Sequence, residues 1–138
     1  MFSFHTRVRY QETDKGGRVY HANYLIWLDM TRTEFLRQGG VEYAQIEQQG
    51  FFLLIKKANI EYFGSAIFDD EIEIVMKSVA RNKIRLDFHY DILHNLSRKL
   101  LVEAYTQLVC VDKDGKPIKI PEKINSVINK FNNKEINK

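Results

Sequence analysis

The sequence contains very little cysteine. Its 138 residues include one cysteine, Cys110, so no internal disulfide can form and a cysteine-based metal site is not expected. A single cysteine is typical of proteins from a reducing compartment. The histidines His5, His89 and His94 lack the spacing and the partners of metal ligands. We therefore expect no metal site, and we expect Cys110 to be a small core residue.

Long apolar runs and a strong net charge are also missing. No segment approaches the roughly 18 apolar residues that a membrane-spanning helix needs, and the N-terminal segment MFSFHTRVRY lacks the apolar core of a secretory signal. The net charge is only +3, and no basic stripe is interleaved with aromatic residues, so nucleic-acid binding is not indicated. The length and the 44% hydrophobic content predict one globular domain over residues 1–138, located in the cytoplasm.

The sequence does contain helical and strand patterns in a definite order. The expected elements are a strand over 2–10, a loop over 11–21, helices over 22–38 and 41–49, strands over 51–63, 70–79, 83–94 and 99–111, a turn over 112–116, and a terminal helix that starts near Pro121 and frays in its last few residues. The first half of helix 22–38 is apolar on most faces, which is typical of a central helix.

Short turns between successive strands indicate antiparallel pairing. The clearest alternation lies in residues 83–94, where Leu86, Phe88 and Tyr90 face one way and Asp87 and His89 face the other. One strand, one apolar helix and four consecutive strands predict an α+β fold of two layers. In this fold a curved antiparallel sheet is wrapped around one central helix.

The segment most suggestive of chemistry is Tyr10–Tyr24, YQETDKGGRVYHANY, which leads into the apolar helix. It holds a carboxylate at Asp14, two glycines and a histidine at His21. Backbone N–H groups at a helix start are unpaired and partly positive, so they can polarise a carbonyl oxygen. A carboxylate beside them can act as a nucleophile or a general base, and the glycines let a ligand approach the backbone. The alternative interpretation is that Asp14 only stabilises a turn.

This segment resembles the YbgC-like branch of the 4-hydroxybenzoyl-CoA thioesterase family, which has the hot-dog fold. The family carries a pattern like Y-x-x-T-D-x-x-G-x-V-Y-H-x-x-Y-L, followed by a helix with R-x-E-x-L-R. The matching residues are Tyr10, Thr13, Asp14, Gly17, Val19, Tyr20, His21, Tyr24, Leu25, Arg32, Glu34, Leu36 and Arg37. The resemblance extends from about residue 4 to about residue 121.

The resemblance implies an enzyme that hydrolyses the thioester bond of an acyl-CoA to a free acid and CoA. Asp14 would be the catalytic carboxylate, accompanied by His21 and Tyr10, and the backbone N–H near His21 would face the thioester carbonyl. Gly17 and Tyr24 are assigned to substrate binding. No separate cofactor is implied, because CoA is part of the substrate.

The resemblance also implies an assembly. Members of the family form dimers whose sites lie between subunits, and the dimers often pair into tetramers. Arg81 and Lys83, in the strand turn of the neighbouring subunit, would then meet the CoA phosphates. This chain has Ile84 where many relatives carry Ser or Thr, and Ser65 stands before Ala66 where a relative has proline.

Two other functions are alternatives to thioester hydrolysis. A hot-dog dehydratase of fatty-acid synthesis carries a histidine in a proline-rich loop, and both prolines of this chain lie after residue 116, so that motif is absent. The other is a non-catalytic acyl-carrier or interaction module, because YbgC-like proteins are associated with the Tol–Pal envelope system and with phospholipid-synthesis enzymes. Its expected partners are an acyl carrier protein or lipid-synthesis enzymes. An intact Asp14 favours catalysis.

Overall fold

The computed structural model describes residues 1–136, which form a five-stranded sheet and three α-helices. The elements are β1 (Phe2–Arg7), a 3-10 helix (Tyr10–Glu12), α1 (Asn23–Gln38), α2 (Tyr43–Gln48), β2 (Phe52–Tyr62), β3 (Glu71–Arg81), β4 (Arg85–His94), β5 (Leu100–Val111) and α3 (Glu122–Ile136). The strand order is β1-β3-β4-β5-β2, and all neighbouring pairs are antiparallel. The expected fraying of the last residues concerns positions 137–138, which lie outside the described residues.

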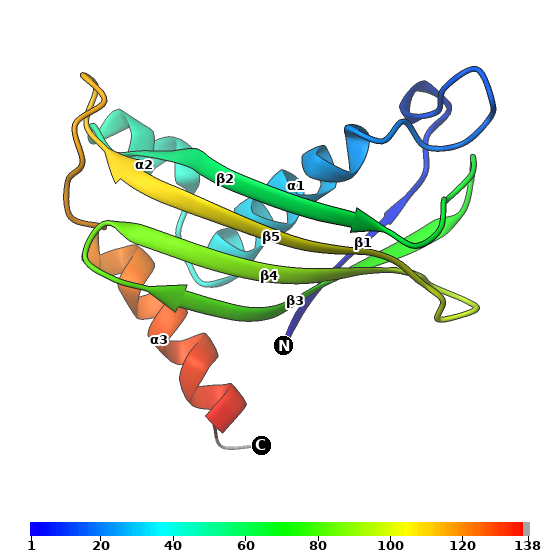
Figure 1. Ribbon diagram of the computed structural model, residues 1–138. Helices are drawn as coiled ribbons and strands as arrows, with labels where there is room; N and C mark the ends of the chain where they lie inside the picture. Colours follow the sequence, from blue (N-terminus) through cyan, green and yellow to red (C-terminus); the bar gives the residue numbers. More distant parts are fainter. Residues whose placement is uncertain (137–138) are drawn as a thin grey trace.

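The curved sheet wraps around α1, as the sequence predicted (Figure 1). The face of α1 that meets the sheet buries Trp27 and Leu28 completely. From the facing strand β4, Leu86, Phe88 and Tyr90 are buried against it, which confirms the predicted alternation. Alternating apolar residues on one side of each strand thus form a core between a single helix and a single sheet. The α+β hot-dog arrangement is confirmed.

The predicted end of the first strand was wrong. The first strand ends at Arg7, not at residue 10, because Val8 exchanges backbone hydrogen bonds with Asp69 and Asp70 and the chain then turns into the 3-10 helix. Helix α1 is covered by the sheet on one side, and the side away from the sheet leaves Ile26 51% exposed. An apolar helix with one uncovered side is a candidate for contact with another surface.

The C-terminal part follows the prediction closely. Asp112 stabilises the predicted turn by accepting hydrogen bonds from the amides of Asp114 and Lys116 at 2.9 and 3.0 Å. Helix α3 begins directly after Pro121, a position where a missing N–H costs nothing. Cys110 is fully buried in β5, and burial raises the pKa of its thiol to about 11. It is a core residue, as expected.

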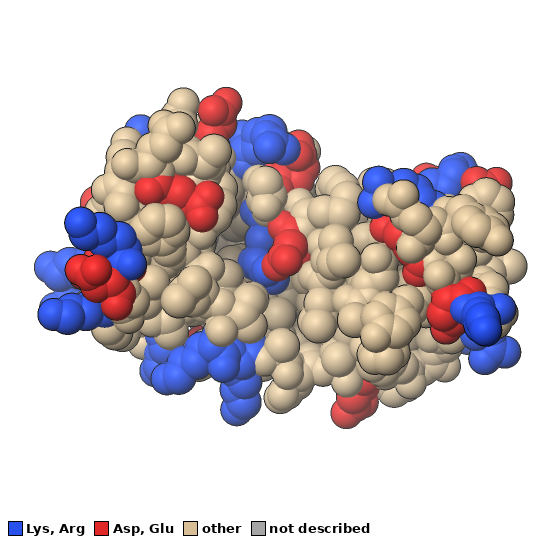
Figure 2. Space-filling model, turned by 90° about the horizontal axis from the view of Figure 1, so that it is seen from above, with Lys and Arg blue, Asp and Glu red and all other residues tan. Residues whose placement is uncertain are grey.

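The strand β2 forms one edge of the sheet and has no buried residue along its length. Leu54, Ile55 and Tyr62 are about half exposed on it. Figure 2 looks down on this edge, where uncharged atoms cover most of the middle of the face. A long apolar edge strand is a surface to which another strand can add.

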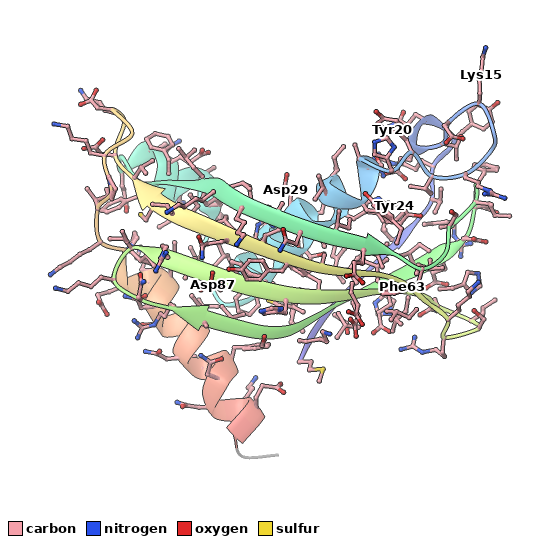
Figure 3. The ribbon with its side chains drawn as sticks, viewed as in Figure 1. Lys15, Tyr20, Tyr24, Asp29, Phe63 and Asp87 are labelled. Atoms are coloured by element: carbon pink, nitrogen blue, oxygen red, sulfur yellow. The ribbon has the colours of Figure 1, made fainter. Side chains whose placement is uncertain are left out.

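The outer face of the sheet, away from α1, is polar. On it, Tyr105 and Gln107 donate hydrogen bonds to the carboxylate of Asp87 at 2.7 and 2.9 Å, and Asp87 points away from α1 in Figure 3. Within residues 1–136, no helix has the length and apolar character needed to cross a membrane.

Candidate active site

Asp14 lies in a tight turn at one end of the sheet. Thr13 and Val19 form an isolated antiparallel bridge, and the amide of Asp14 donates to the carbonyl of Arg18 at 2.8 Å. The amide of Gly17 donates to the carbonyl of Asp14 at 3.0 Å. Gly17 has a φ of 79°, a left-handed conformation that glycine adopts without steric cost. The turn therefore requires this glycine for its shape, and it presents Asp14 on the surface.

The side chain of Asp14 has two different environments. Its Oδ1 accepts a hydrogen bond from the amide of Gly16 at 2.9 Å, which is the local turn bond that an aspartate commonly makes. Its Oδ2 has no hydrogen-bond partner within residues 1–136. One oxygen therefore holds the carboxylate in place while the other remains available. The turn role and a chemical role are compatible in this geometry.

Free backbone donors lie where the chain enters α1. The residue before the helix, Ala22, provides no side-chain cap. The amide N–H groups of His21 and Ala22 find no acceptor in the part of the chain that the structure describes. Such groups can stabilise negative charge on an oxygen.

Tyr62 holds the backbone at this point, a role that no motif in the sequence predicts. Its hydroxyl, at the end of the edge strand β2, donates a hydrogen bond of 2.8 Å to the carbonyl of His21. The ring of His21 itself is exposed and lies 4.4 Å from the ring of Tyr20. The entrance to α1 is thus held to the edge of the sheet.

The other carboxylate of the loop, Glu12, is a structural residue. It is only 4% exposed, and it accepts hydrogen bonds from the amide of Arg9 at 2.8 Å and from the indole nitrogen of Trp27 at 3.0 Å. Burial alone would raise the pKa of Glu12, but the hydrogen bonds from Arg9 and Trp27 hold that pKa below its ordinary value. Glu12 is therefore an ionised anchor that joins the loop to the core.

Tyr10 and Tyr24, which the sequence also assigned to the site, differ in their exposure to solvent. Tyr10 is 78% exposed in the 3-10 helix, with its ring 5.7 Å from that of Phe68. Tyr24 is only 2% exposed, and its hydroxyl accepts a hydrogen bond from the amide of Ala66 at 3.1 Å. Figure 3 shows Tyr20 by the loop and Tyr24 on α1 below it. Tyr24 thus has almost no surface to offer a ligand in the single chain.

Arg81 and Lys83 lie far from Asp14 in the single chain. Their turn, between β3 and β4, is at the opposite end of the sheet from the Asp14 loop (Figure 1). Both residues are exposed, and Arg81 donates to the side chain of Asn129 in α3 at 3.0 Å. Within one chain, Asp14 and His21 belong to the loop that leads into α1, and the two basic residues lie at the other end of the sheet.

Comparison with known proteins gives consistent matches along the chain. The model of the thioesterase-like superfamily matches residues 8–128. The acyl-CoA thioester hydrolase YbgC of Escherichia coli is 34% identical over 125 residues, which cover 90% of this chain and 92% of YbgC.

Two solved structures share the fold. A hypothetical protein of Aquifex aeolicus superimposes with a TM-score of 0.85 at 27% identity, covering 93% of this chain and 99% of that one. The DHNA-CoA thioesterase of Staphylococcus aureus gives a TM-score of 0.85 at 25% identity, covering 95% and 90% of the two chains. The family model spans most of the chain, and the chain therefore belongs to the thioesterase-like superfamily.

Proposed function

We propose that this protein hydrolyses acyl-CoA thioesters with Asp14 as its catalytic carboxylate. The observation that carries the proposal is Asp14 itself, whose carboxylate is held with a free Oδ2 by a tight turn in the loop that leads into α1. The unpaired amides of His21 and Ala22 lie at that entrance. Membership of the thioesterase-like superfamily, with YbgC among the relatives, supports the same chemistry.

The reaction requires an attack on the thioester carbonyl and the departure of CoA. Asp14 either attacks the carbonyl carbon directly or takes a proton from the attacking water. The negative charge that develops on the carbonyl oxygen is stabilised by backbone N–H groups at the start of α1. The C–S bond then breaks, and CoA leaves as the thiolate and takes up a proton. After attack by water the acyl group is released directly as the acid, whereas after attack by Asp14 it forms a mixed anhydride that water hydrolyses to the acid and free Asp14. No charged side chain other than Asp14 is needed for these steps.

A second copy of the chain completes the site in this proposal. The edge strand β2 is eleven residues long and carries exposed apolar side chains, whereas the other edge strand, β1, is six residues long. Two β2 strands related by a two-fold axis pair in antiparallel orientation. The Tyr62 end of one strand then lies beside the Phe52 end of the other, and the β3–β4 turn of the partner subunit comes toward the Asp14 loop.

The pairing of β2 edges gives the exposed basic residues a function. Arg81 and Lys83 of one subunit would bind CoA phosphates while the thioester lies at Asp14 of the other subunit. Phosphate binding by basic side chains is charge-assisted and favourable. The pairing also accounts for the distance between these residues and Asp14 within a single chain (Figure 1).

The test is the release of free thiol from a series of acyl-CoAs of graded chain length and with aromatic acyl groups. We expect hydrolysis of at least one class at a rate that saturates with substrate. If no acyl-CoA or acyl carrier protein thioester is hydrolysed while acyl-CoA still binds, the proposal is wrong and a non-catalytic acyl-binding role replaces it.

A further inference from the structure

A cavity of about 400 Å³ lies between α1, α2 and the start of β2. Its apolar walls are formed by Leu36, Leu53, Ile55, Leu86, Phe88 and Leu108. Figure 2 shows the corresponding hollow in the face that carries the β2 edge, with both basic and acidic atoms inside it. A concave apolar site with a few polar groups is the usual form of a small-molecule pocket.

Arg32 lines this cavity, and it is the buried cation among the described residues. Its Nη1 donates to the hydroxyl of Tyr90 at 3.0 Å and to that of Thr106 at 3.4 Å, and its Nη2 donates to the carboxylate of Asp29. A guanidinium has five N–H donors. These contacts use three of them, so two donors of a nearly buried cation remain without an acceptor in residues 1–136.

The stability of the fold does not by itself explain why an arginine is buried at position 32. Tyr90 and Thr106 already hydrogen-bond to each other at 3.0 Å, so neither hydroxyl depends on the guanidinium. Burial raises the pKa of Tyr90 even with Arg32 beside it, so the tyrosine stays neutral and is not a counter-ion. A buried cation is costly unless its donors are satisfied, and an apolar residue of similar size often stabilises as well or better. The two remaining donors are therefore available to a ligand atom that enters the cavity.

The charges around the cavity restrict what that atom can be. The carboxylate of Asp29 contacts Arg32 from the solvent side and is 65% exposed, and Glu47 of α2 also lines the cavity. Figure 3 shows Asp29 on α1 behind the β2 edge. Two carboxylates and one guanidinium leave a net negative charge at the cavity, which disfavours a further carboxylate. An uncharged oxygen, which accepts a hydrogen bond without adding charge, satisfies the free donors.

The cavity also lies where an acyl group would be expected in the pair of subunits. It opens at the Leu53–Ile55 end of β2, and the backbone of His21 is held at the Tyr62 end. Antiparallel pairing of two β2 strands brings these two ends together across the interface. The cavity of one subunit would then lie beside the Asp14 turn of the other.

We propose that this cavity receives the acyl group and that Arg32 selects acyl-CoAs whose chain carries an uncharged oxygen, a hydroxyl or keto group, remote from the thioester. The inference rests on the proposed thioesterase function and names its substrate class. Charged dicarboxylic acyl groups are excluded by Asp29 and Glu47, and unsubstituted chains leave two donors of Arg32 unpaired. Because these donors stay unpaired, unsubstituted acyl chains are poorer substrates than oxygenated chains of the same length.

The experiment compares kcat/KM for pairs of acyl-CoAs of equal length that differ only in one hydroxyl or keto group, with the group moved along the chain. We expect the oxygenated member to be preferred at one position by about tenfold or more, which is the range for a hydrogen bond to a charged donor. The dicarboxylic analogue should be the poorest of the set. Absence of preference at every position, or preference for the dicarboxylic analogue, would overturn the inference.

Substitution of Arg32 separates selection from a structural role. Arg32→Met, which keeps the length and removes the donors, should reduce the preference ratio by about tenfold or more. Arg32→Lys keeps the charge without the planar fork and should reduce the ratio by a smaller factor. Arg37→Met is the matched control, because Arg37 lies on the same helix, is exposed and pairs with Glu34. A ratio that is unchanged in a folded Arg32→Met protein would contradict the inference.

Binding measurements keep this inference distinct from the proposed function. Calorimetry with thioether analogues of the paired acyl-CoAs, which cannot be hydrolysed, should give tighter binding of the oxygenated member to the wild-type protein. If the protein hydrolyses no thioester but shows this preference, only the proposed function is wrong. If it hydrolyses thioesters and the analogues bind equally, only the role of Arg32 is wrong.

Discussion

Glu12 and Trp27 are joined by a hydrogen bond of 3.0 Å from the indole nitrogen to the carboxylate. This bond ties the loop that carries Asp14 to the buried face of α1. The same carboxylate accepts from the amide of Arg9 at 2.8 Å. Of the two carboxylates in the loop, Glu12 is thus structural, and Asp14 is exposed and available for chemistry.

Glu12→Gln should destabilise the protein. The amide keeps the size of the side chain, but it loses the negative charge that strengthens the bonds from Arg9 and Trp27, and it places two N–H donors where acceptors are needed. We expect a loss of about 2–3 kcal/mol in the free energy of unfolding, measured with urea. Glu103→Gln, an exposed position on β5, is the control and should change little.

The contribution of Glu12 should depend on pH in a defined direction. Its folded-state pKa is lowered, so the unfolded chain binds a proton first as the pH falls. The stabilisation is fully present above the ordinary value of 4.5 and is lost as the pH falls through the lower folded value. The difference in unfolding free energy between wild type and Glu12→Gln should therefore shrink between pH 6 and pH 3. A constant difference over this range would contradict the assignment.

Asp14→Asn should abolish most activity with little effect on stability. The amide oxygen can still accept the bond from Gly16, so the turn is preserved, while the charge and the nucleophilic oxygen are lost. We expect thiol release to fall by at least about 10²-fold and the melting temperature to change by little. Asp114→Asn, in the exposed turn before Gly115, is the matched control. A folded Asp14→Asn protein with near-normal turnover would sink the proposal.

Replacing Arg81 and Lys83 together with alanine should raise KM more than it lowers kcat. The CoA phosphates are held alike in the ground state and in the transition state, so their loss weakens binding uniformly. Saturation kinetics with a good acyl-CoA substrate provide the measurement. Lys130→Ala with Lys134→Ala, on the exposed side of α3, removes the same charge elsewhere and should leave KM unchanged. An unchanged KM in this double variant would show that Arg81 and Lys83 do not bind the CoA phosphates.

Leu54→Glu should separate the subunits and lower activity together. Leu54 is 51% exposed on β2, and a charge there opposes the burial of this edge. Light scattering after size exclusion should detect a dimer or larger assembly for the wild type and a smaller species for the variant. Leu96→Glu is the control, because Leu96 is 85% exposed in the β4–β5 turn. A monomeric, fully active wild type would contradict the pairing of β2 edges.

The sequence predicted the elements well where a periodic pattern dominated. The alternation in β4 and the turn at Asp112 depend on residues that are neighbours in the sequence, and both features were predicted correctly. The end of β1 was placed too late because Tyr10 continues the alternation, while the real boundary is set by hydrogen bonds from Val8 to residues about sixty positions away. Such long-range pairing leaves no local signal in the sequence.

The site was predictable only in part for the same reason. Asp14 and His21 belong to one short segment, so their place in the loop that leads into α1 followed from the sequence. Tyr62, which bonds to the carbonyl of His21, is forty-one positions away and carries no motif. The hydrogen bond from the amide of Ala66 to Tyr24 likewise joins residues forty-two positions apart. Contacts made across the fold had to come from the structure.

The buried thiol of Cys110 has a practical consequence for an enzyme whose product is itself a thiol. Exchange with a disulfide requires an accessible thiolate, and a fully buried group with a pKa of about 11 supplies almost none at neutral pH. The protein should neither react with colorimetric thiol reagents nor form mixed disulfides with oxidised CoA that accumulates in air. Catalysis should therefore persist in oxidising buffer without added reductant.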